Sequence, residues 1–288
     1  MTNFKVSGDD LLGAKKVPWL PFRDVTIKPK YIVVHYTGGS SVASSINYLR
    51  KVGFSYHLLI DRDGAVVQGA PLAKRASHAG YSNWKGLDSL NNHSIGISLA
   101  NLGYLDRHGT KFYRTNSHGD KTTNTFDDSE VVASRHWNGH NGSTVVGWER
   151  YTEKQYESLK LVCSALIDAF PNIVDAIGHD EIAIGRKPDP GVAFEWANIS
   201  SLFSNRLTDL GPVYEVNVGG NDKLNVRKGP NGTWGVSDKL APGTRVHLRS
   251  FAYTYWNGKP RKSNWASIAL DGSMSHYGFV SSKYLTKI

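Results

Sequence analysis

The sequence contains one cysteine among 288 residues, and no apolar run approaches the length of about 20 residues that a membrane-spanning helix needs. One cysteine cannot form an internal disulfide, so the fold is not expected to depend on an oxidising compartment. Cys163 lies within an apolar helical pattern, which predicts a small core residue. Acidic residues interrupt the N-terminal segment MTNFKVSGDDLLGAKK where a signal peptide has its apolar region, so Sec export is not expected.

Hydrophobic residues make up 40% and charged residues 20% of the chain, which is ordinary for a globular protein. The length favours two domains. The net charge of +9 is unevenly distributed, because residues 212–288 hold 11 Lys and Arg against 4 Asp and Glu. A basic C-terminal module beside a nearly neutral remainder indicates an anionic polymer as partner: nucleic acid, a lipid surface or a cell-wall polymer.

The first part of the chain predicts alternating strands and helices. The run YIVVHYTG at 31–38 is typical of a buried strand, and residues 41–53 have the apolar spacing of a helix that ends at a glycine. Residues 54–69 predict a hairpin that turns through Arg-Asp-Gly. Another strand is expected at 93–103.

Two further segments complete this part. Residues 104–150 match neither helix nor strand, and we expect an irregular insertion, either a functional loop or a mobile segment, outside the core. Residues 151–170 predict the strongest helix, with Thr152 as cap and Gln155 three residues later. Together these elements indicate an α/β domain over residues 1–211, with a central mixed β-sheet flanked by helices.

After residue 211 the pattern changes to short strands separated by glycine and asparagine turns. No helical period remains in this part of the chain. Residues 212–288 therefore predict a second domain, a small all-β barrel.

A candidate metal site emerges from the stretch GHDEIAIGRKPDPG at 178–191. His179 and Asp189 offer a nitrogen and an oxygen ligand, and His35 follows the apolar run of the first strand. Three such ligands leave a zinc ion one open position for water. Lys187 could then stabilise the oxyanion that forms when activated water attacks a carbonyl. The alternative is a proline-stiffened loop with solvated charges.

Five motifs occur in the order seen in one enzyme family: YIVVHYTG, SYHLLIDRDGAV, SHAG, SIGISLANLG and GHDEIAIGRKPDPG. From about residue 28 to about residue 200 the chain resembles the zinc-dependent N-acetylmuramoyl-L-alanine amidases of the type 2 amidase and peptidoglycan-recognition-protein superfamily. The resemblance implies one Zn²⁺ ion held by His35, His179 and Asp189, with Lys187 as a catalytic residue.

The resemblance also implies that Tyr56 assists the water at the metal. Ser98 departs from the pattern of the cytoplasmic recycling branch, which has a catalytic glutamate at this position. The chain is therefore assigned to the phage and recognition-protein branches, which rely on the tyrosine. Glu149, within the expected insertion, is the alternative candidate for the missing carboxylate.

The other histidines of this part are weaker candidates. His78, in SHAG, resembles a family position that faces the substrate, so we predict a substrate-binding role. His57 follows Tyr56 along a strand and its side chain points to the opposite face, which indicates a structural role. His136 and His140 could approach a metal, but a solvent-exposed loop is the favoured interpretation.

The C-terminal motifs LNVRKGPNG and YGFVSSKYL resemble those of bacterial SH3 domains. This resemblance implies binding to peptidoglycan or its cross-bridge peptides. Tyr253, Tyr255 and Trp256 stand in a loop-like stretch beside basic residues, and they are the candidate wall-binding residues. A tethered wall-binding domain would raise the local concentration of the catalytic domain.

The expected function is hydrolysis of the amide between N-acetylmuramic acid and L-alanine, with a phage or prophage endolysin as the favoured role. Such a protein would be made in the cytoplasm and would act on the cell wall or periplasm after release by a holin or another secretion route. A bacterial autolysin or an injected effector would share this chemistry. A non-catalytic recognition protein is the main alternative, and a nucleic-acid binder is a weaker one. We expect a monomer with peptidoglycan as its partner, no nucleic acid and no membrane insertion.

Overall fold

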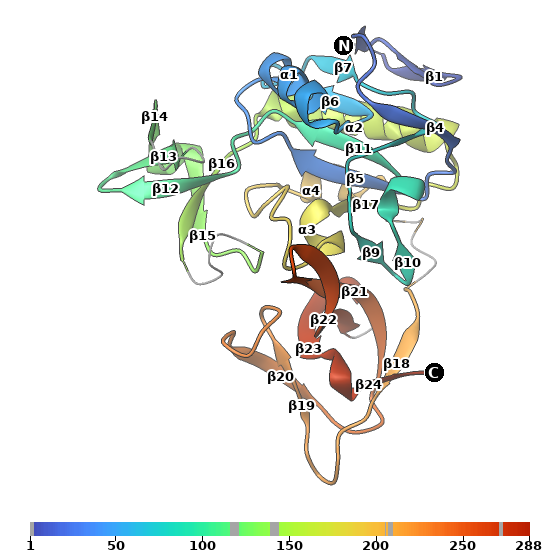
Figure 1. Ribbon diagram of the computed structural model, residues 1–288, viewed down its shortest axis with the longest axis vertical. Coiled ribbons are helices and arrows are strands. Elements are labelled where there is room, and N and C mark those ends of the chain that lie inside the picture. The colour runs from blue at the N-terminus through green and yellow to red at the C-terminus, as the bar shows by residue number, and fades with distance from the viewer. Residues whose placement is uncertain (1–2, 116–120, 139–143, 205, 207–209, 271–272) are drawn as a thin grey trace. The chain divides into compact units, whose positions relative to one another are not determined.

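The computed structural model describes residues 3–115, 121–138, 144–204, 206, 210–270 and 273–288 (Figure 1). Contacts divide the chain into two compact units. The first comprises Met1–Gly80, Asn91–His179 and Asp189–Leu207, and the second comprises Tyr81–Leu90, Asp180–Pro188 and Thr208–Ile288. No helix among the described residues is long and apolar enough to cross a bilayer.

A six-stranded sheet forms the centre of the first unit (Figure 1). Its strands are, in spatial order, β17 (Asp175–Gly178), β5 (Tyr31–Tyr36), β11 (Ser94–Leu99), β6 (Leu58–Ile60), β7 (Val66–Gln68) and β3 (Lys15–Lys16). The first four run parallel, whereas β7 is antiparallel to β6. The mixed sheet that the sequence predicted is therefore confirmed.

The predicted helices form where their capping residues stand. Helix α1 (Val42–Val52) begins after Ser41, whose side chain accepts from the Ser44 backbone N–H, and ends at Gly53 with a φ of 73°. Helix α2 (Glu153–Ala169) begins with the predicted capping box between Thr152 and Gln155. The short helices α3 (His179–Ile182) and α4 (Ala197–Ser200) follow.

The apolar face of α2 and one face of the sheet form the main core. Leu159, Cys163 and Leu166 of the helix belong to one buried cluster with Ile32 and Ile97 of the sheet. Because side chains alternate along a strand, Val33 and His35 lie on the opposite face of the sheet from Ile32. On that opposite face, Leu59 belongs to a second buried cluster with Ile46 and Leu49 of α1. His35 is on the same face, at the carboxyl end of β5.

Two small antiparallel ribbons and a short helical turn complete the periphery of the first unit. The ribbons are β1 (Lys5–Ser7) with β2 (Asp10–Leu12), and β4 (Phe22–Thr26) with β8 (Lys74–Ala76); the turn is η1, a 3₁₀ helix whose last residue is Asn92.

The insertion is a sheet, which corrects the expectation of an irregular segment. Its strands are β12 (Tyr104–His108), β13 (Lys111–Thr115), β14 (Lys121–Phe126), β15 (Val131–Ser134) and β16 (Val146–Glu149), with the turn η2 (Asp128–Glu130) before β15. They pair antiparallel in the order β14-β13-β12-β16-β15. Among its described residues, Leu105, Phe112 and Val131 form one small buried cluster, and Val146 and Trp148 of β16 belong to another with Ala193. So few apolar positions, divided between two clusters, do not form a strand pattern that the sequence reveals.

The C-terminal part of the second unit is all-β, as predicted. Its strands are β18 (Val213–Val216), β19 (Leu224–Arg227), β20 (Val236–Leu240), β21 (Arg245–Trp256), β22 (Lys259–Leu270), β23 (Ser273–Ser281) and β24 (Leu285–Lys287), with the turn η3 (Ser282–Tyr284). They form one seven-stranded sheet whose ends are β20 and β24. Its likeness to an SH3 barrel stays a prediction.

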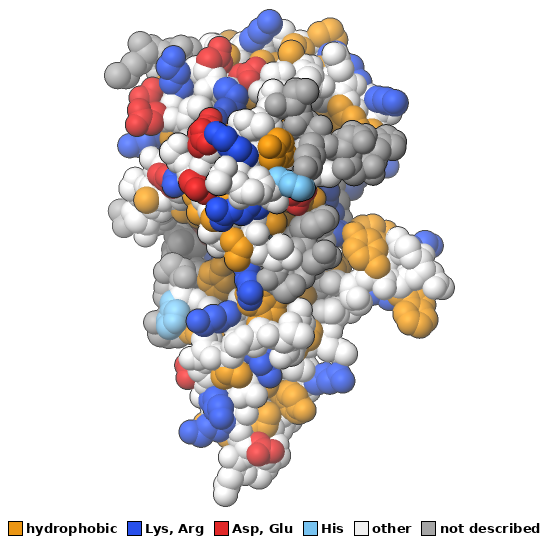
Figure 2. All heavy atoms as spheres, turned by 90° about the vertical axis from the view of Figure 1, so that its left-hand side faces the viewer, with side chains coloured by type: hydrophobic (Ala, Val, Ile, Leu, Met, Phe, Trp, Pro, Cys, Tyr) orange, Lys and Arg blue, Asp and Glu red, His pale blue; other side chains and the backbone are white. Residues whose placement is uncertain are grey.

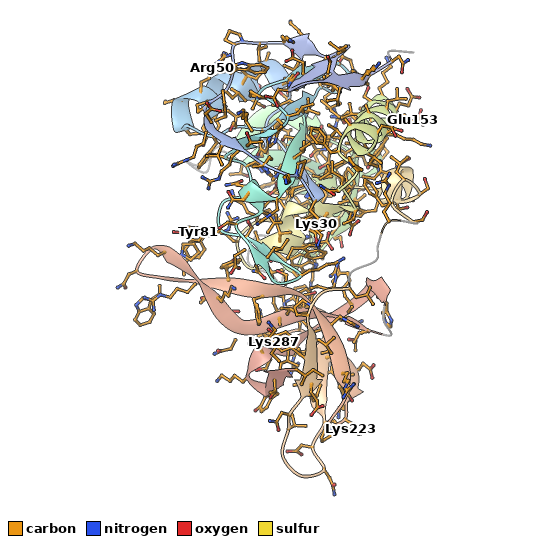
Figure 3. The ribbon with its side chains drawn as sticks, turned by 90° about the vertical axis from the view of Figure 1, so that its right-hand side faces the viewer. Lys30, Arg50, Tyr81, Glu153, Lys223 and Lys287 are labelled. Atoms are coloured by element: carbon orange, nitrogen blue, oxygen red, sulfur yellow. The ribbon has the colours of Figure 1, made fainter. Side chains whose placement is uncertain are left out.

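Strands β21 and β22 form a long hairpin, which is visible as a twisted ribbon in Figure 3. The turn is made by Asn257 and Gly258, with φ values of 47° and 71°. Positive φ at both central residues is what a two-residue hairpin turn requires, and Asn-Gly is the sequence that adopts it most readily.

The second unit also contains two segments from the middle of the chain, which the predicted boundary at residue 211 did not anticipate. The ribbon β9 (Asn83–Trp84) and β10 (Leu87–Asp88) is joined to β21 by the Asn83 side chain, whose amide bridges the backbone of Phe251 at 2.6 and 2.9 Å. In the segment 180–188, the Ile184 carbonyl accepts from the Tyr253 N–H at 2.7 Å. Arg249 forms an ion pair with Glu181 in the same segment.

Candidate metal centre

Two neighbouring strands place the histidine ligands side by side. In the parallel pair β17 and β5, Gly178 lies opposite Val34. The residue after each of these is a histidine, His35 still within β5 and His179 directly after β17, so both lie at the same carboxyl edge of the sheet. Ligand sites of α/β sheets form at this edge. The pairing of β17 with β5 is therefore enough to bring together two histidines that are 144 residues apart in the sequence.

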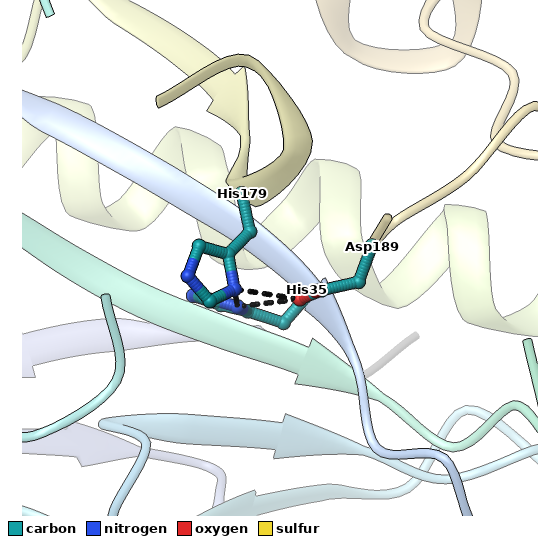
Figure 4. Close-up of side chains that lie close together, drawn as sticks. All are labelled: His35, His179 and Asp189. Carbon is teal, nitrogen blue, oxygen red and sulfur yellow. Dashed lines mark hydrogen bonds and ion pairs between the residues drawn. The ribbon is translucent and has the colours of Figure 1, made fainter. Parts of the chain in front are cut away.

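The three predicted ligand atoms converge (Figure 4). His35 Nδ1 lies 3.0 Å from His179 Nδ1, and Asp189 Oδ2 lies 2.8 and 2.9 Å from these two nitrogens. Among the residues that the structure describes, these three form the only group of histidine, cysteine and acidic side chains able to hold a metal ion. All three side chains are buried, His35 completely.

This donor set fits zinc. Two imidazole nitrogens and one carboxylate oxygen are a common ligand set of catalytic zinc sites, in which the fourth position takes water. Donors around a tetrahedral zinc ion lie roughly 3.3 Å apart for metal–donor bonds of about 2.0–2.1 Å. The observed separations of 2.8–3.0 Å need to widen by only a few tenths of an ångström.

The Asp189 carboxylate is held in its charged form. Burial by itself would raise its pKa, but the charge and hydrogen bond of His179, together with those of His35, outweigh burial and hold the pKa well below its usual value. An ionised carboxylate is the form that binds a metal ion.

A tight loop places Asp189 in position. Gly191, two residues later, has a φ of 78°, and a Cβ at this position would lie 2.4 Å from Cε3 of Trp148. The buried Trp148 belongs to β16 of the insertion. The insertion thus packs against the loop that carries the third ligand, and glycine is the residue this close approach allows.

Tyr56 lies beside the first ligand. Its ring centroid is 4.8 Å from that of His35. Burial raises the pKa of Tyr56, the charge of Asp189 raises it further, and the nearby Ser98 hydroxyl opposes this rise. The phenol therefore stays protonated at neutral pH and can donate a hydrogen bond. Ser98 itself lies opposite His35 in the pairing of β11 with β5.

His78 is buried behind the ligands, and its described contacts are with protein groups. Its Nδ1 lies 3.0 Å from His35 Nε2, and its Nε2 lies 3.4 Å from the Ser94 hydroxyl. Burial lowers its pKa well below the usual value, and the neighbouring His35, His57 and His179 lower it further. The predicted substrate-binding role of His78 stays a prediction.

His57 has a structural environment, as its place on the strand indicated. Its Nδ1 accepts from the Gly96 N–H at 2.9 Å, and its Nε2 lies 2.8 Å from the Lys74 carbonyl. Burial lowers its pKa to about 4, and the hydrogen bond to Lys74 only partly offsets this effect. His57 is thus a neutral residue whose two ring nitrogens both have backbone partners.

Lys187 belongs to the second unit, in the segment 180–188 between two of the ligands. Its backbone N–H donates to the Ala183 carbonyl at 3.1 Å, and its side chain is exposed. The catalytic role predicted for its ammonium group stays a prediction.

His136 corrects the interpretation as a solvent-exposed loop residue. Its side chain is only 4% exposed, and its ring lies 5.2 Å from that of Trp148. Burial lowers its pKa to about 4, against the opposing charge of Asp189. No local pattern around His136 indicates this burial, because it depends on packing against β16 of the insertion sheet. His140 lies outside the described residues.

Glu149, the alternative carboxylate, has structural partners. Its Oε2 accepts from the Leu102 N–H at 2.5 Å, and its Oε1 lies 3.4 Å from an Arg62 nitrogen. Burial raises its pKa, although the bond from Leu102 and the charge of Arg62 oppose the rise. These contacts account for the burial of a glutamate at the end of β16, and its role as the alternative carboxylate stays a prediction.

The three aromatic residues predicted to bind the wall differ in exposure. Tyr255 and Trp256 are 55% and 61% exposed beside the turn of the β21–β22 hairpin, whereas Tyr253 is 9% exposed. The Tyr253 ring is thus buried within the unit. Basic side chains outnumber acidic ones on the visible face of the C-terminal sheet, in the lower half of Figure 2.

Residues 25–192 match the family described as Amidase_2, N-acetylmuramoyl-L-alanine amidase. The chain belongs to this family. The match covers more than half of the 288 residues and includes all three candidate ligands. The C-terminal sheet lies beyond it.

Similar proteins include the 1,6-anhydro-N-acetylmuramyl-L-alanine amidase AmpD of Escherichia coli K12, which is 34% identical over 155 residues. That alignment covers 54% of this chain and 61% of AmpD. The N-acetylmuramoyl-L-alanine amidase AmiD of the same organism is 25% identical over 178 residues, 59% of this chain and 52% of AmiD. A crystal structure of selenomethionine AmpD covers 69% of this chain and 99% of its own, with 26% identity and a TM-score of 0.45.

These relatives bear on the branch inferred from Ser98. Five sequences named 1,6-anhydro-N-acetylmuramyl-L-alanine amidase AmpD match with 33–34% identity, and none of these five is named as a phage or recognition protein. Similarity over the whole domain therefore does not support the placement among the phage and recognition branches. That placement stays a prediction.

Proposed function

We propose that the protein hydrolyses the amide bond between N-acetylmuramic acid and the L-alanine of a peptidoglycan stem peptide. The convergence of His35, His179 and Asp189 on one point carries this proposal. Family membership over residues 25–192 supports the substrate class. A recognition protein without activity is the less favoured alternative, because a complete ligand set is present.

Zinc at this centre would act as a Lewis acid that polarises the carbonyl of the scissile amide and lowers the pKa of a bound water molecule. The chain's own residues would do the rest. The two histidines and Asp189 hold the ion, and the Tyr56 phenol donates a hydrogen bond that orients the attacking water. The Lys187 ammonium stabilises negative charge on the carbonyl oxygen. Oxygen of water bonds to the carbonyl carbon, the carbon–nitrogen bond breaks, and the amine leaves with a proton.

The proposed substrate is polymeric peptidoglycan. The basic all-β region with an exposed Tyr255-Trp256 pair supports a wall-binding role for the second unit. A soluble anhydromuropeptide is the second candidate, since AmpD relatives are named for 1,6-anhydro-N-acetylmuramyl-L-alanine. A phage endolysin is the role we favour, acting on the wall after holin-mediated release; an autolysin or an injected effector would use the same site.

Purified sacculi and a soluble anhydromuropeptide, each incubated with the full chain, test this proposal. Mass spectrometry should detect free stem peptides that begin with alanine, and a chelator should abolish them. Release of stem peptides from sacculi supports polymeric peptidoglycan as the substrate. Cleavage of the soluble substrate alone supports the anhydromuropeptide. If the zinc-loaded protein cleaves neither substrate, the proposed hydrolysis is wrong and the alternative of a recognition protein without activity is favoured.

Wall binding is tested separately in a sedimentation assay with sacculi. Trp256→Ala removes an exposed ring from the hairpin, and loss of a stacking contact should weaken binding by roughly tenfold or more. Trp234→Ala, which changes a tryptophan outside the hairpin, is the control. Equal binding by the wild type and the Trp256 variant would exclude this hairpin as the wall contact.

A further inference from the structure

We propose that the dipeptide His78-Ala79 is the outer shell of the metal centre, in which each residue accepts a hydrogen bond from one of the two histidine ligands. This inference rests on the proposed zinc site and concerns how that site is positioned. It assigns to His78 the role of a positioning residue for His35.

In each ligand histidine, the two ring nitrogens face different partners. The Nδ1 atoms of His35 and His179 face Asp189. The Nε2 atom of His35 lies 3.0 Å from His78 Nδ1, and that of His179 lies 3.0 Å from the Ala79 carbonyl oxygen. The two groups behind the ligands are therefore consecutive in the chain.

This arrangement determines the proton positions. A metal ion at the convergence point takes the unprotonated Nδ1 of each ligand, so Nε2 of each carries hydrogen. The Ala79 carbonyl can only accept, which matches the His179 N–H. His78 Nδ1 must then be the unprotonated acceptor for His35, and the His78 proton is on Nε2, the nitrogen directed at Ser94. One neutral tautomer of His78 satisfies every contact.

The dipeptide is itself held in place from two sides. The Asn91 side-chain oxygen accepts from the backbone N–H groups of His78 and Ala79, at 3.1 and 2.7 Å. On the sheet side, a Cβ at Gly96 would lie only 2.5 Å from Cγ of His78, so only glycine leaves room for the imidazole. Asn91 and Gly96 thus support the outer shell, and Gly96 does so from within the SIGISL motif.

An outer-shell acceptor orients its ligand and makes it more basic, and losing one weakens metal binding by about 10–100-fold. A merely structural His78 would instead affect folding and leave zinc affinity unchanged. The affinity of the folded protein for zinc therefore separates the two roles without reference to activity.

The test compares three full-length variants by chelator competition, with circular dichroism to verify folding. His78→Leu removes the acceptor, and its zinc affinity should fall by about 10–100-fold. His78→Asn places an oxygen near the position of Nδ1, so affinity should return close to the wild-type value. His57→Asn is the matched control, because His57 is an equally buried neighbour whose ring nitrogens contact only Gly96 and Lys74. It should bind zinc like the wild type.

A folded His78→Leu variant with wild-type zinc affinity would overturn the inference, and so would a His78→Asn variant as weak as His78→Leu. If His78→Leu does not fold, nitrogen-15 NMR of the zinc-loaded wild type decides. The His78 ring should be neutral with its proton on Nε2, and a proton on Nδ1 would refute the assignment. Both measurements are independent of catalysis, so a protein that binds zinc as described but cleaves no amide would contradict only the proposed function.

Discussion

The two units of this protein present their polar chemistry in opposite ways. In the first unit, three ionisable side chains converge in a buried position. In the C-terminal sheet of the second, the candidate functional residues Tyr255 and Trp256 are exposed beside a turn. Burying ionisable groups costs free energy unless a charge or metal compensates, whereas exposed aromatic residues cost little. The buried cluster is therefore strong support for a function, and the exposed pair is weak support.

The segment 180–188 complicates this contrast. It joins two metal ligands of the first unit, yet it belongs to the second unit, where it is bonded to β21 through Ile184 and Glu181. The residue predicted to stabilise the oxyanion, Lys187, lies in this segment.

The largest effect is expected from the buried cluster. His179→Ala removes a ligand, so zinc should be lost and turnover should fall by roughly 10³-fold or more, since a metal ion contributes several kcal/mol to the transition state. Metal content by atomic absorption and amide cleavage measure both. His247→Ala is the control in the second unit, where Nδ1 contacts only the Gly211 carbonyl among its described side-chain bonds. If His179→Ala still binds zinc, the predicted metal centre of the first unit is wrong.

The next effect concerns Lys187. Lys187→Ala should lower turnover about 10²–10³-fold, the cost of losing one oxyanion-stabilising group, while zinc remains bound. The measurement is the rate of amide cleavage at saturating substrate, with zinc content determined on the same sample. Lys283→Ala, which changes an exposed lysine of the same unit, should leave the rate unaltered. A wild-type rate for Lys187→Ala would contradict the catalytic role predicted for this lysine.

A smaller effect tests how the segment 180–188 is held. Arg249→Met leaves the Glu181 carboxylate without its ion-pair partner and removes a guanidinium that lies 3.8 Å from the Tyr277 ring centroid. The free energy of unfolding should fall by about 3 kcal/mol, measured by denaturant titration of the full chain. Adding Glu181→Gln removes the uncompensated charge, so the double variant should lose less. A double variant that is less stable than Arg249→Met would contradict a buried pair.

The smallest effect comes from Glu149 and depends on pH. Because its pKa is raised in the folded protein, the folded state binds the proton more tightly than the unfolded chain does. Its contribution to stability is therefore greatest below the usual pKa of 4.5 and decreases as the pH rises through the folded-state value. Glu149→Gln does not titrate at this position. The stability of the wild type relative to Glu149→Gln should thus decline with rising pH in denaturant titrations, and a difference independent of pH would refute the shift.

Much of the first unit could be predicted because its signals are local. The capping box of Thr152 and Gln155, the glycine after α1 and the β-branched apolar run of β5 all act within a few residues. The insertion escaped prediction because its strands bury few apolar side chains. The association of residues 81–90 and 180–188 with the C-terminal sheet also escaped, because side-chain bonds such as Asn83 to Phe251 span 168 residues.

By itself, the sequence determined the α/β character of the first part, the all-β character of the last part and the identity of the three candidate ligands. Secondary-structure propensity and motif spacing depend on residues that are close together in the sequence, so they can be recognised without knowing the tertiary structure. Only the tertiary structure decided that His78 and Ala79 lie behind the two histidine ligands and that His136 is buried against Trp148. Those contacts join residues far apart in the chain, and no pattern within either segment specifies its distant partner.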